Sequence, residues 1–110
     1  MPINTSGIAL ADRVKELSYA TGTSNLTLDG AAAGFSSFSD LYSSGDVVFY
    51  AATDGVSYEV GSGIFHTKAA APDELERICL VSTNSNSKVN WGASVKEVFV
   101  TYPADLSVYT

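Results

Sequence analysis

The chain has 110 residues, of which 45% are hydrophobic and 16% are charged, and its net charge at pH 7 is −6. This length provides one domain with one core, and the composition excludes the disordered class, which combines low hydrophobicity with high charge. The six basic residues are scattered along the chain. Because no basic patch is available to bind phosphates or an acidic lipid surface, neither nucleic acid nor a membrane is an expected partner.

The first residues, Met1-Pro2-Ile3-Asn4, lack the basic and apolar regions of a signal peptide, and no apolar stretch approaches the length that spans a membrane. Cys79 is the only cysteine, so the fold does not depend on an intrachain disulfide. Its position in the apolar run 78–81 favours a buried small hydrophobe, with a reactive thiol as the alternative.

The N-terminal half begins with residues 1–12, which are interpreted as an arm. Residues 13–19 alternate as in a strand, although part of this segment also fits one face of a short helix. A turn then precedes a short strand at residues 26–28. In segment 31–44 the apolar residues recur at helical spacing, which is compatible with one short helix near residues 36–43 that plugs a barrel end. The residues on that helical face are Phe35, Phe38, Leu41 and Tyr42.

The clearest local pattern is a hairpin. A β-branched and aromatic run, residues 46–53, is followed by Asp54-Gly55 and then by residues 56–60, which alternate with period 2. An Asp-Gly pair fits a two-residue type I′ turn, whose central residues both have positive φ. In the second arm one face carries Val56, Tyr58 and Val60, and the other carries Ser57 and Glu59.

The C-terminal half contains the remaining predicted strands. Gly61-Ser62-Gly63 is predicted to bend or bulge the chain, and a proline-containing loop follows at residues 69–73. Strands are predicted at 74–82, 88–91 and 95–102. On the first of these the predicted inward residues are Leu75, Ile78 and either Leu80 or Val81, and on the last Val98 and Val100 lie opposite Phe99.

These elements predict an all-β protein, a small antiparallel sandwich or barrel of about 7–8 short strands with one short helix. The predicted domain spans residues 13–103, between the arm 1–12 and a tail at residues 104–110. No repeat of 20–50 residues is visible.

No catalytic motif emerges. The twelve acidic residues suggest turns and a solvated loop, because nothing selects two of them as a pair in a cleft. His66 is the sole histidine, and Gly61-Ser62-Gly63 has the wrong spacing for a nucleophile elbow. Spacing does not exclude a His66–Cys79 pair, although apolar surroundings would raise the pKa of the Cys79 thiol. An enzyme that uses His66 therefore stays as a third hypothesis, and catalysis is not expected.

Metal and cofactor motifs are also missing from the sequence. One histidine and one cysteine cannot form a tetrahedral zinc site without carboxylates, and the calcium-loop and phosphate-loop patterns are absent. Neither a metal nor a cofactor is expected. Aromatic residues are the remaining candidates for binding, because they dominate protein cores and interfaces and also stack on sugars. The candidate glycan face comprises Tyr42, Tyr50, Tyr58 and Trp91.

A set of short motifs follows one order along nearly the whole chain. They are Ala11-Asp12-Arg13-Val14-Lys15-Glu16, Thr21-Gly22-Thr23, Leu26-Thr27-Leu28, Gly30-Ala31, Gly34-Phe35, Phe38, Tyr50, Asp54-Gly55, Glu59-Val60-Gly61, Gly63, Ser82-Thr83-Asn84, Val89-Asn90, Lys96 and Val98-Phe99-Val100-Thr101-Tyr102-Pro103-Ala104.

Over residues 11–104 this order and spacing resembles a short module of tailed-phage and prophage structural proteins. Similar modules occur at the attachment ends of tail fibres and spikes, and as small free-standing virion proteins. The resemblance implies no catalytic residues. The chain departs from the pattern at residues 69–76, where its loop is more acidic and carries Pro72, which puts a partner contact through this loop in doubt.

The resemblance implies a virion structural protein, assembled in the host cytoplasm. We expect an oligomeric base, collar, adaptor or decoration subunit that anchors a fibre or spike to the capsid or tail, because no shaft follows the module. Its expected partners are further copies of itself, in a symmetric homo-oligomer, and capsid, portal or neck, tail or fibre proteins. The alternative is a carbohydrate-binding β-module for host-surface recognition. The residues expected to contact other subunits or virion partners are Ile3, Ile8, Leu10, Leu106, Val108 and Tyr109.

Overall fold

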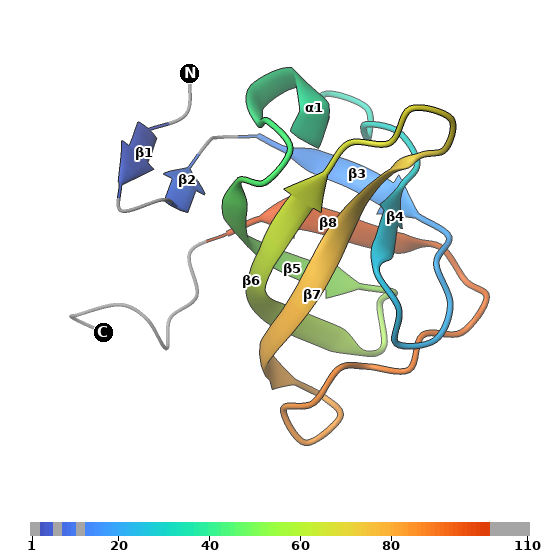
Figure 1. Cartoon of the computed structure of the whole chain (residues 1–110). Coiled ribbons are helices and arrows are strands. Elements are labelled where there is room, and N and C mark those ends of the chain that lie inside the picture. The colour runs from blue at the N-terminus through green and yellow to red at the C-terminus, as the bar shows by residue number, and fades with distance from the viewer. Residues whose placement is uncertain (1–2, 6–7, 11–12, 102–110) are drawn as a thin grey trace.

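The computed structural model describes residues 3–5, 8–10 and 13–101, with side chains within 13–101. It confirms the all-β class, with eight strands and one short helix in the described part of the chain (Figure 1). The elements are β1 (Ile3–Thr5), β2 (Ile8–Leu10), β3 (Lys15–Ser18), β4 (Leu26–Leu28), α1 (Phe38–Leu41), β5 (Val47–Thr53), β6 (Tyr58–His66), β7 (Asp73–Ser82) and β8 (Lys96–Val100).

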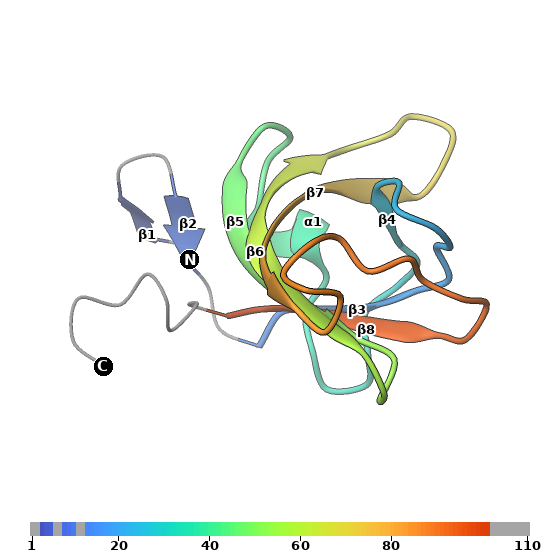
Figure 2. The ribbon, with the colours of Figure 1, turned by 90° about the horizontal axis from the view of Figure 1, so that it is seen from below.

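Six of the strands curl into a nearly closed antiparallel barrel in the order β4-β7-β6-β5-β8-β3 (Figure 2). Backbone hydrogen bonds join the two ends of this sheet: Leu17 donates to Gly30 O (2.9 Å) and receives a bond from Asp29 N (2.8 Å). The segment predicted as an arm contains β1 and β2, which pair with each other, and β2 pairs in parallel with β5 at Ile8 and Val47. The two short strands lie beside the barrel (Figure 1).

The predicted hairpin is confirmed, but its predicted two-residue turn is wrong. The last cross-strand pair of β5 and β6 is Thr53 with Tyr58, which leaves four residues in the loop. Asp54 Oδ1 accepts hydrogen bonds from the backbone N–H groups of Val56 (2.9 Å) and Ser57 (2.8 Å). Asp54 therefore organises the loop through its side chain, and only Gly55 has a positive φ there (+95°).

The predicted irregularity at residues 61–63 is confirmed as a register shift between Val60 and Gly61 in the pairing of β6 with β7, and β6 continues through it as one strand. The glycines are needed because the two strands approach closely. A Cβ atom at Gly61 would lie 2.1 Å from Ile78 O, and one at Gly63 would lie 2.7 Å from Glu76 O. The sharp coil of the barrel at this point thus depends on the absence of side chains.

The predicted short helix is confirmed as α1, and its cap explains where it starts. Ser37 Oγ accepts from Asp40 N (3.2 Å), while Asp40 Oδ2 accepts from Ser37 N (3.3 Å), which is a capping box. Phe38 is buried and its ring stacks on Phe65 with centroids 6.2 Å apart. The helix thereby packs its apolar side against the barrel core.

The barrel interior mixes apolar and polar side chains, which the sequence did not suggest. On β6, Glu59 and Phe65 point inward, whereas Val60 and Tyr58 point outward. On β7, the predicted inward residue Ile78 is wrong: it is 45% exposed, and the neighbouring Arg77 is buried instead. The buried apolar cluster comprises Val14, Leu26, Leu28, Phe38, Tyr42, Val48, Tyr50, Ala52, Phe65, Leu75, Val89, Trp91 and Val98.

The strand predicted at residues 88–91 is also wrong. Only Trp91 forms a β-bridge there, with Gly22. The backbone at Val89 instead bonds to the buried side chains Glu59 and Arg77, through its N–H and C=O groups respectively. Valine and tryptophan are common in strands because they pack well in half-buried sheets. Here Val89 and Trp91 are buried in the core without forming a regular strand.

Candidate functional site

The four aromatic residues predicted to form a glycan face do not lie on one exposed surface. Tyr42, Tyr50 and Trp91 are 5%, 0% and 3% exposed, and only Tyr58 is open to solvent, at 45%. Tyr50 donates its hydroxyl hydrogen bond to Glu59 inside the barrel, and the Arg77 guanidinium lies 6.0 Å from the centre of the Trp91 ring. Because three of the four rings build the core, the glycan face they were predicted to form is wrong.

A buried ion pair occupies the centre of the barrel. Arg77 Nε donates to Glu59 Oε2 (2.9 Å), and Nη2 donates to the other carboxylate oxygen and to Val89 O. Burial by itself would raise the pKa of Glu59, but hydrogen bonds from Arg77, Tyr50 and the Val89 N–H outweigh it and lower that pKa. Both side chains are fully enclosed, so the pair holds the fold together and is not accessible to a substrate.

The structure does not bring His66 and Cys79 together. His66 pairs in register with Glu74, whereas Cys79 pairs with Gly61, five positions away along β6. His66 Nε2 lies 3.0 Å from Glu76 Oε1 at the surface, where both side chains are partly exposed. Burial raises the pKa of the Cys79 thiol. The two residues therefore form no nucleophile–base pair.

Within residues 13–101, no group of three or more histidine, cysteine, aspartate or glutamate side chains is arranged to hold a metal ion. The only helix described there is a single short turn, and no helix of membrane-spanning length and hydropathy is present among the described residues.

The first candidate surface is the outer face of β6 and β7. Cross-strand pairs that share this face include Val60 with Val81 and Ser62 with Ile78. Ile64 lies on the same side, opposite Glu76, and Tyr58 lies at the other end. We call this surface the outer β6–β7 face; it comprises Tyr58, Val60, Ser62, Ile64, Glu76, Ile78 and Val81. Its apolar side chains project outward from the strands that turn Glu59 and Arg77 inward.

The second candidate surface is a shallow hollow of about 530 Å³ over β3 and β8. The Arg13 guanidinium lies 4.2 Å from the centre of the Phe35 ring, and Lys15 Nζ lies 4.4 Å from the same centre. Lys15 also faces Phe99, its cross-strand partner, and forms an ion pair with Glu97 at 3.3 Å. We call this surface the Arg13–Phe99 groove; it comprises Arg13, Val14, Lys15, Phe35, Thr53, Glu97, Phe99 and Val100.

The backbone around the groove is held in an unusual conformation. Arg13 has a φ of +58°, which non-glycine residues rarely adopt. Its Nε and Nη2 atoms both donate to Gly34 O, at 3.2 and 3.0 Å, and its own carbonyl accepts from Ser36 N at 2.8 Å. These bonds hold the 34–36 loop, and with it Phe35, against the start of β3.

Sequence reasoning did not find this groove. Its residues come from four separate segments, and only the register of β3 with β8 places Lys15 beside Phe99. Of the contact residues predicted from the sequence, the backbone places Ile3 in β1 and Ile8 and Leu10 in β2. The remaining predicted contacts, Leu106, Val108 and Tyr109, lie outside the described residues.

Comparisons of the chain with protein-family models, with curated proteins and with solved structures give no match.

Proposed function

We propose that this protein is a structural subunit of a phage virion, an oligomeric base, adaptor or decoration protein that anchors a fibre or spike to the capsid or tail. The proposal draws on the ordered motifs between Ala11 and Ala104, which resemble those of phage attachment modules. His66 and Cys79 lie apart on the sheet, and Glu59 is enclosed in the barrel, so these residues suggest no competing activity.

The observation that carries the proposal is the outer β6–β7 face. A strand of a soluble barrel normally directs its apolar side chains inward and its polar side chains outward. β6 does the reverse at its first residues: Glu59 is fully buried, while Tyr58 is 45% exposed. On β7, Arg77 is buried and Ile78 is 45% exposed. An apolar outer face on a small acidic protein is typical of a surface that another subunit covers.

Light scattering on the full chain tests this proposal. We expect a molar mass that is a multiple of 11.5 kDa and that depends on concentration. Ile78→Asp should shift the equilibrium toward the monomer, because it places a charge in the apolar face. Val95→Asp is the matched control, since Val95 is 42% exposed and directly precedes β8, across the barrel from β7. A wild-type chain that stays monomeric at high concentration and does not bind purified particles would contradict the proposal.

A further inference from the structure

We infer that copies of this chain associate head to tail, with the Arg13–Phe99 groove of one copy receiving the outer β6–β7 face of the next. This inference rests on the proposed function and names the subunit contact within it. It follows from where the two surfaces lie, from their chemistry and from the rigidity of the groove.

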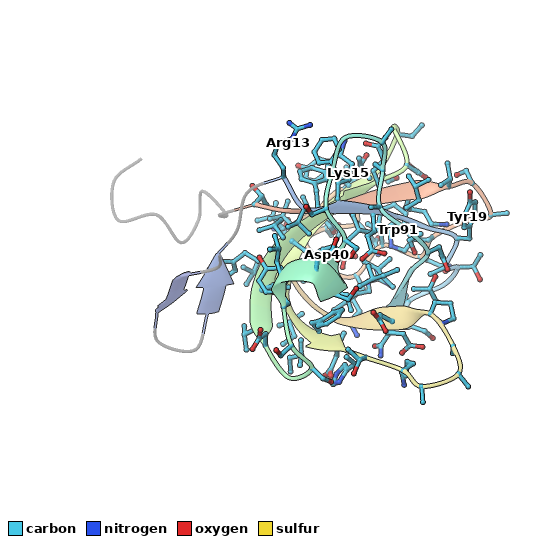
Figure 3. All side chains as sticks on the ribbon, turned by 90° about the horizontal axis from the view of Figure 1, so that it is seen from above. Arg13, Lys15, Tyr19, Asp40 and Trp91 are labelled. Atoms are coloured by element: carbon cyan, nitrogen blue, oxygen red, sulfur yellow. The ribbon has the colours of Figure 1, made fainter. Side chains whose placement is uncertain are left out.

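The two surfaces lie on opposite sides of the barrel. In the strand order β4-β7-β6-β5-β8-β3, β7 and β8 are three positions apart in a ring of six. Figure 2 shows β7 across the barrel from β8 and β3. Arg13 and Lys15 lie on the side of β3 and β8, away from β7 (Figure 3). One copy can therefore use both surfaces at once, each with a different neighbour.

The chemistry of the surfaces is complementary. The groove presents two cations, Arg13 and Lys15, and one carboxylate, Glu97, beside the half-buried rings of Phe35 and Phe99, so its net charge is positive. The outer β6–β7 face presents apolar side chains next to Glu76, whose side chain is 46% exposed. Contact between them would place Glu76 beside a cation and an aliphatic residue such as Ile78 beside an aromatic ring. Attraction between opposite charges then sets the register, and apolar burial contributes most of the affinity.

The distribution of charge on the molecule favours this pairing over others. Two of the six cations, Arg77 and Lys96, are buried, Lys68 lies 3.7 Å from Glu74, and Lys15 shares the groove with its ion-pair partner Glu97 (3.3 Å) and with Arg13. In a chain of net charge −6, the groove is thus a rare place where an acidic surface is attracted. A groove against a groove would bring together two surfaces that each carry two cations and one carboxylate, and two outer faces would bring together two surfaces that each carry Glu76. Both symmetric pairings join surfaces of the same net charge, so head-to-tail contact is preferred.

The groove is also preorganised. Arginine and lysine side chains normally lose considerable rotamer entropy when a partner binds. Here the Arg13 guanidinium is already fixed by Gly34 O and by the Phe35 ring, and Lys15 is held between two rings and Glu97. A partner that docks on these side chains pays less for ordering them. A head-to-tail contact closes into a ring when the rotation between copies allows it, which fits a symmetric base or collar.

A mixing experiment on the full-length chain tests the inference. Arg13→Glu disables the groove but keeps the outer face, and Ile78→Asp disables the outer face but keeps the groove. Each variant alone should associate roughly tenfold or more weakly than the wild type. An equimolar mixture should form a dimer and nothing larger, because the intact face of the first fits the intact groove of the second. Sedimentation velocity measures the species, and circular dichroism confirms that both variants are folded.

Lys88→Glu provides the control, because it makes the same change of charge on an exposed loop away from the groove. It should leave the association unchanged, and added salt should weaken the wild-type contact. If the wild type is oligomeric but the mixture gives no dimer, the head-to-tail contact is wrong while the proposed function stands. If the wild type is monomeric under all conditions and does not bind particles, both are wrong.

Discussion

Arg77 connects three parts of the chain that are distant in sequence. Its guanidinium bonds to Glu59 on β6, to the carbonyls of Gly22 (3.2 Å) and Ser24 (3.0 Å) and to the carbonyl of Val89 (2.7 Å). Removing one partner from a buried ion pair leaves the other charge without compensation, which is strongly destabilising. Two adjacent loops, which a β-bridge between Gly22 and Trp91 joins, are therefore held in place by one side chain.

Glu59→Gln should lower the free energy of unfolding by about 3–5 kcal/mol, because Arg77 then stays buried without a carboxylate. Arg77→Met should have a comparable effect, since it leaves Glu59 charged and enclosed. The double variant should lose clearly less than the sum of the two single losses, because neither charge is then left alone. Urea unfolding measures all three. Additive losses would contradict a direct coupling between the two side chains.

Glu16 should give the protein a pH dependence of the opposite sign to that of Glu59. Burial raises the pKa of Glu16, although its carboxylate accepts from Phe38 N (2.8 Å) and Gly30 N (3.1 Å). A raised pKa in the folded state means that the stability due to this group is fully present below its unfolded pKa of 4.5. That stability is lost as the pH rises through the folded pKa.

Glu16→Gln removes the titration and should flatten this part of the pH profile. We expect the melting temperature of the wild type to fall relative to that of the variant as the pH rises above about 4.5, because only the wild type loses stability when Glu16 ionises. A constant offset across that range would show that Glu16 does not titrate there.

At the scale of the elements, the coil of β6 around β7 depends on Gly61. Gly61→Ala should lower the free energy of unfolding by about 3 kcal/mol or more, because the new methyl group overlaps the backbone at Ile78 and β7 cannot move away freely. Gly92→Ala is the matched control: no atom lies within 4 Å of its added Cβ and its φ is not positive. Its effect should stay below about 1 kcal/mol. Similar losses for the two variants in thermal or urea unfolding would show that the close approach is not restrictive.

The elements that the sequence predicted correctly are those decided by neighbouring residues. The hairpin followed from two β-rich runs around Asp54-Gly55. The helix α1 followed from apolar residues that recur at helical spacing. The inward and outward faces were not predictable in the same way. Alternation shows which residues share a face but does not say which face is buried, and the barrel turns Glu59 rather than Tyr58 inward because Arg77 pairs with it.

The candidate surfaces were the least predictable part, because they depend on long-range pairing. Four aromatic residues were expected on one exposed face, yet three of them fill the core around the buried ion pair. The groove forms because β3 pairs with β8, which places Lys15 beside Phe99 although the two residues are far apart in the sequence. Sequence spacing alone carries no information about such contacts.

At the scale of the whole molecule, the residues that stabilise the barrel are different from those proposed to contact other subunits. The buried cluster and the Glu59–Arg77 pair lie entirely within residues 14–98. Inside the barrel Glu59 accepts hydrogen bonds from Tyr50 and Arg77, while apolar side chains remain on the outside of β6 and β7. The residues that hold the fold together are thus distinct from the apolar residues of the outer β6–β7 face.

A chain reduced to residues 13–101 should therefore retain the barrel, because its six strands all remain and, among the described residues, the lost β2 pairs with β5 at Ile8 and Val47 alone. We expect its melting temperature to fall by about 5 °C or less, which corresponds to roughly 1 kcal/mol in a domain of this size. Head-to-tail association should persist, since the groove and the outer β6–β7 face both remain. Binding to purified particles should weaken, because the removed segments carry the residues expected to contact other virion proteins, Ile3 and Leu106 among them. Light scattering and co-sedimentation with particles measure the two properties separately, and particle binding that is unaffected by the truncation would assign the attachment to the barrel itself.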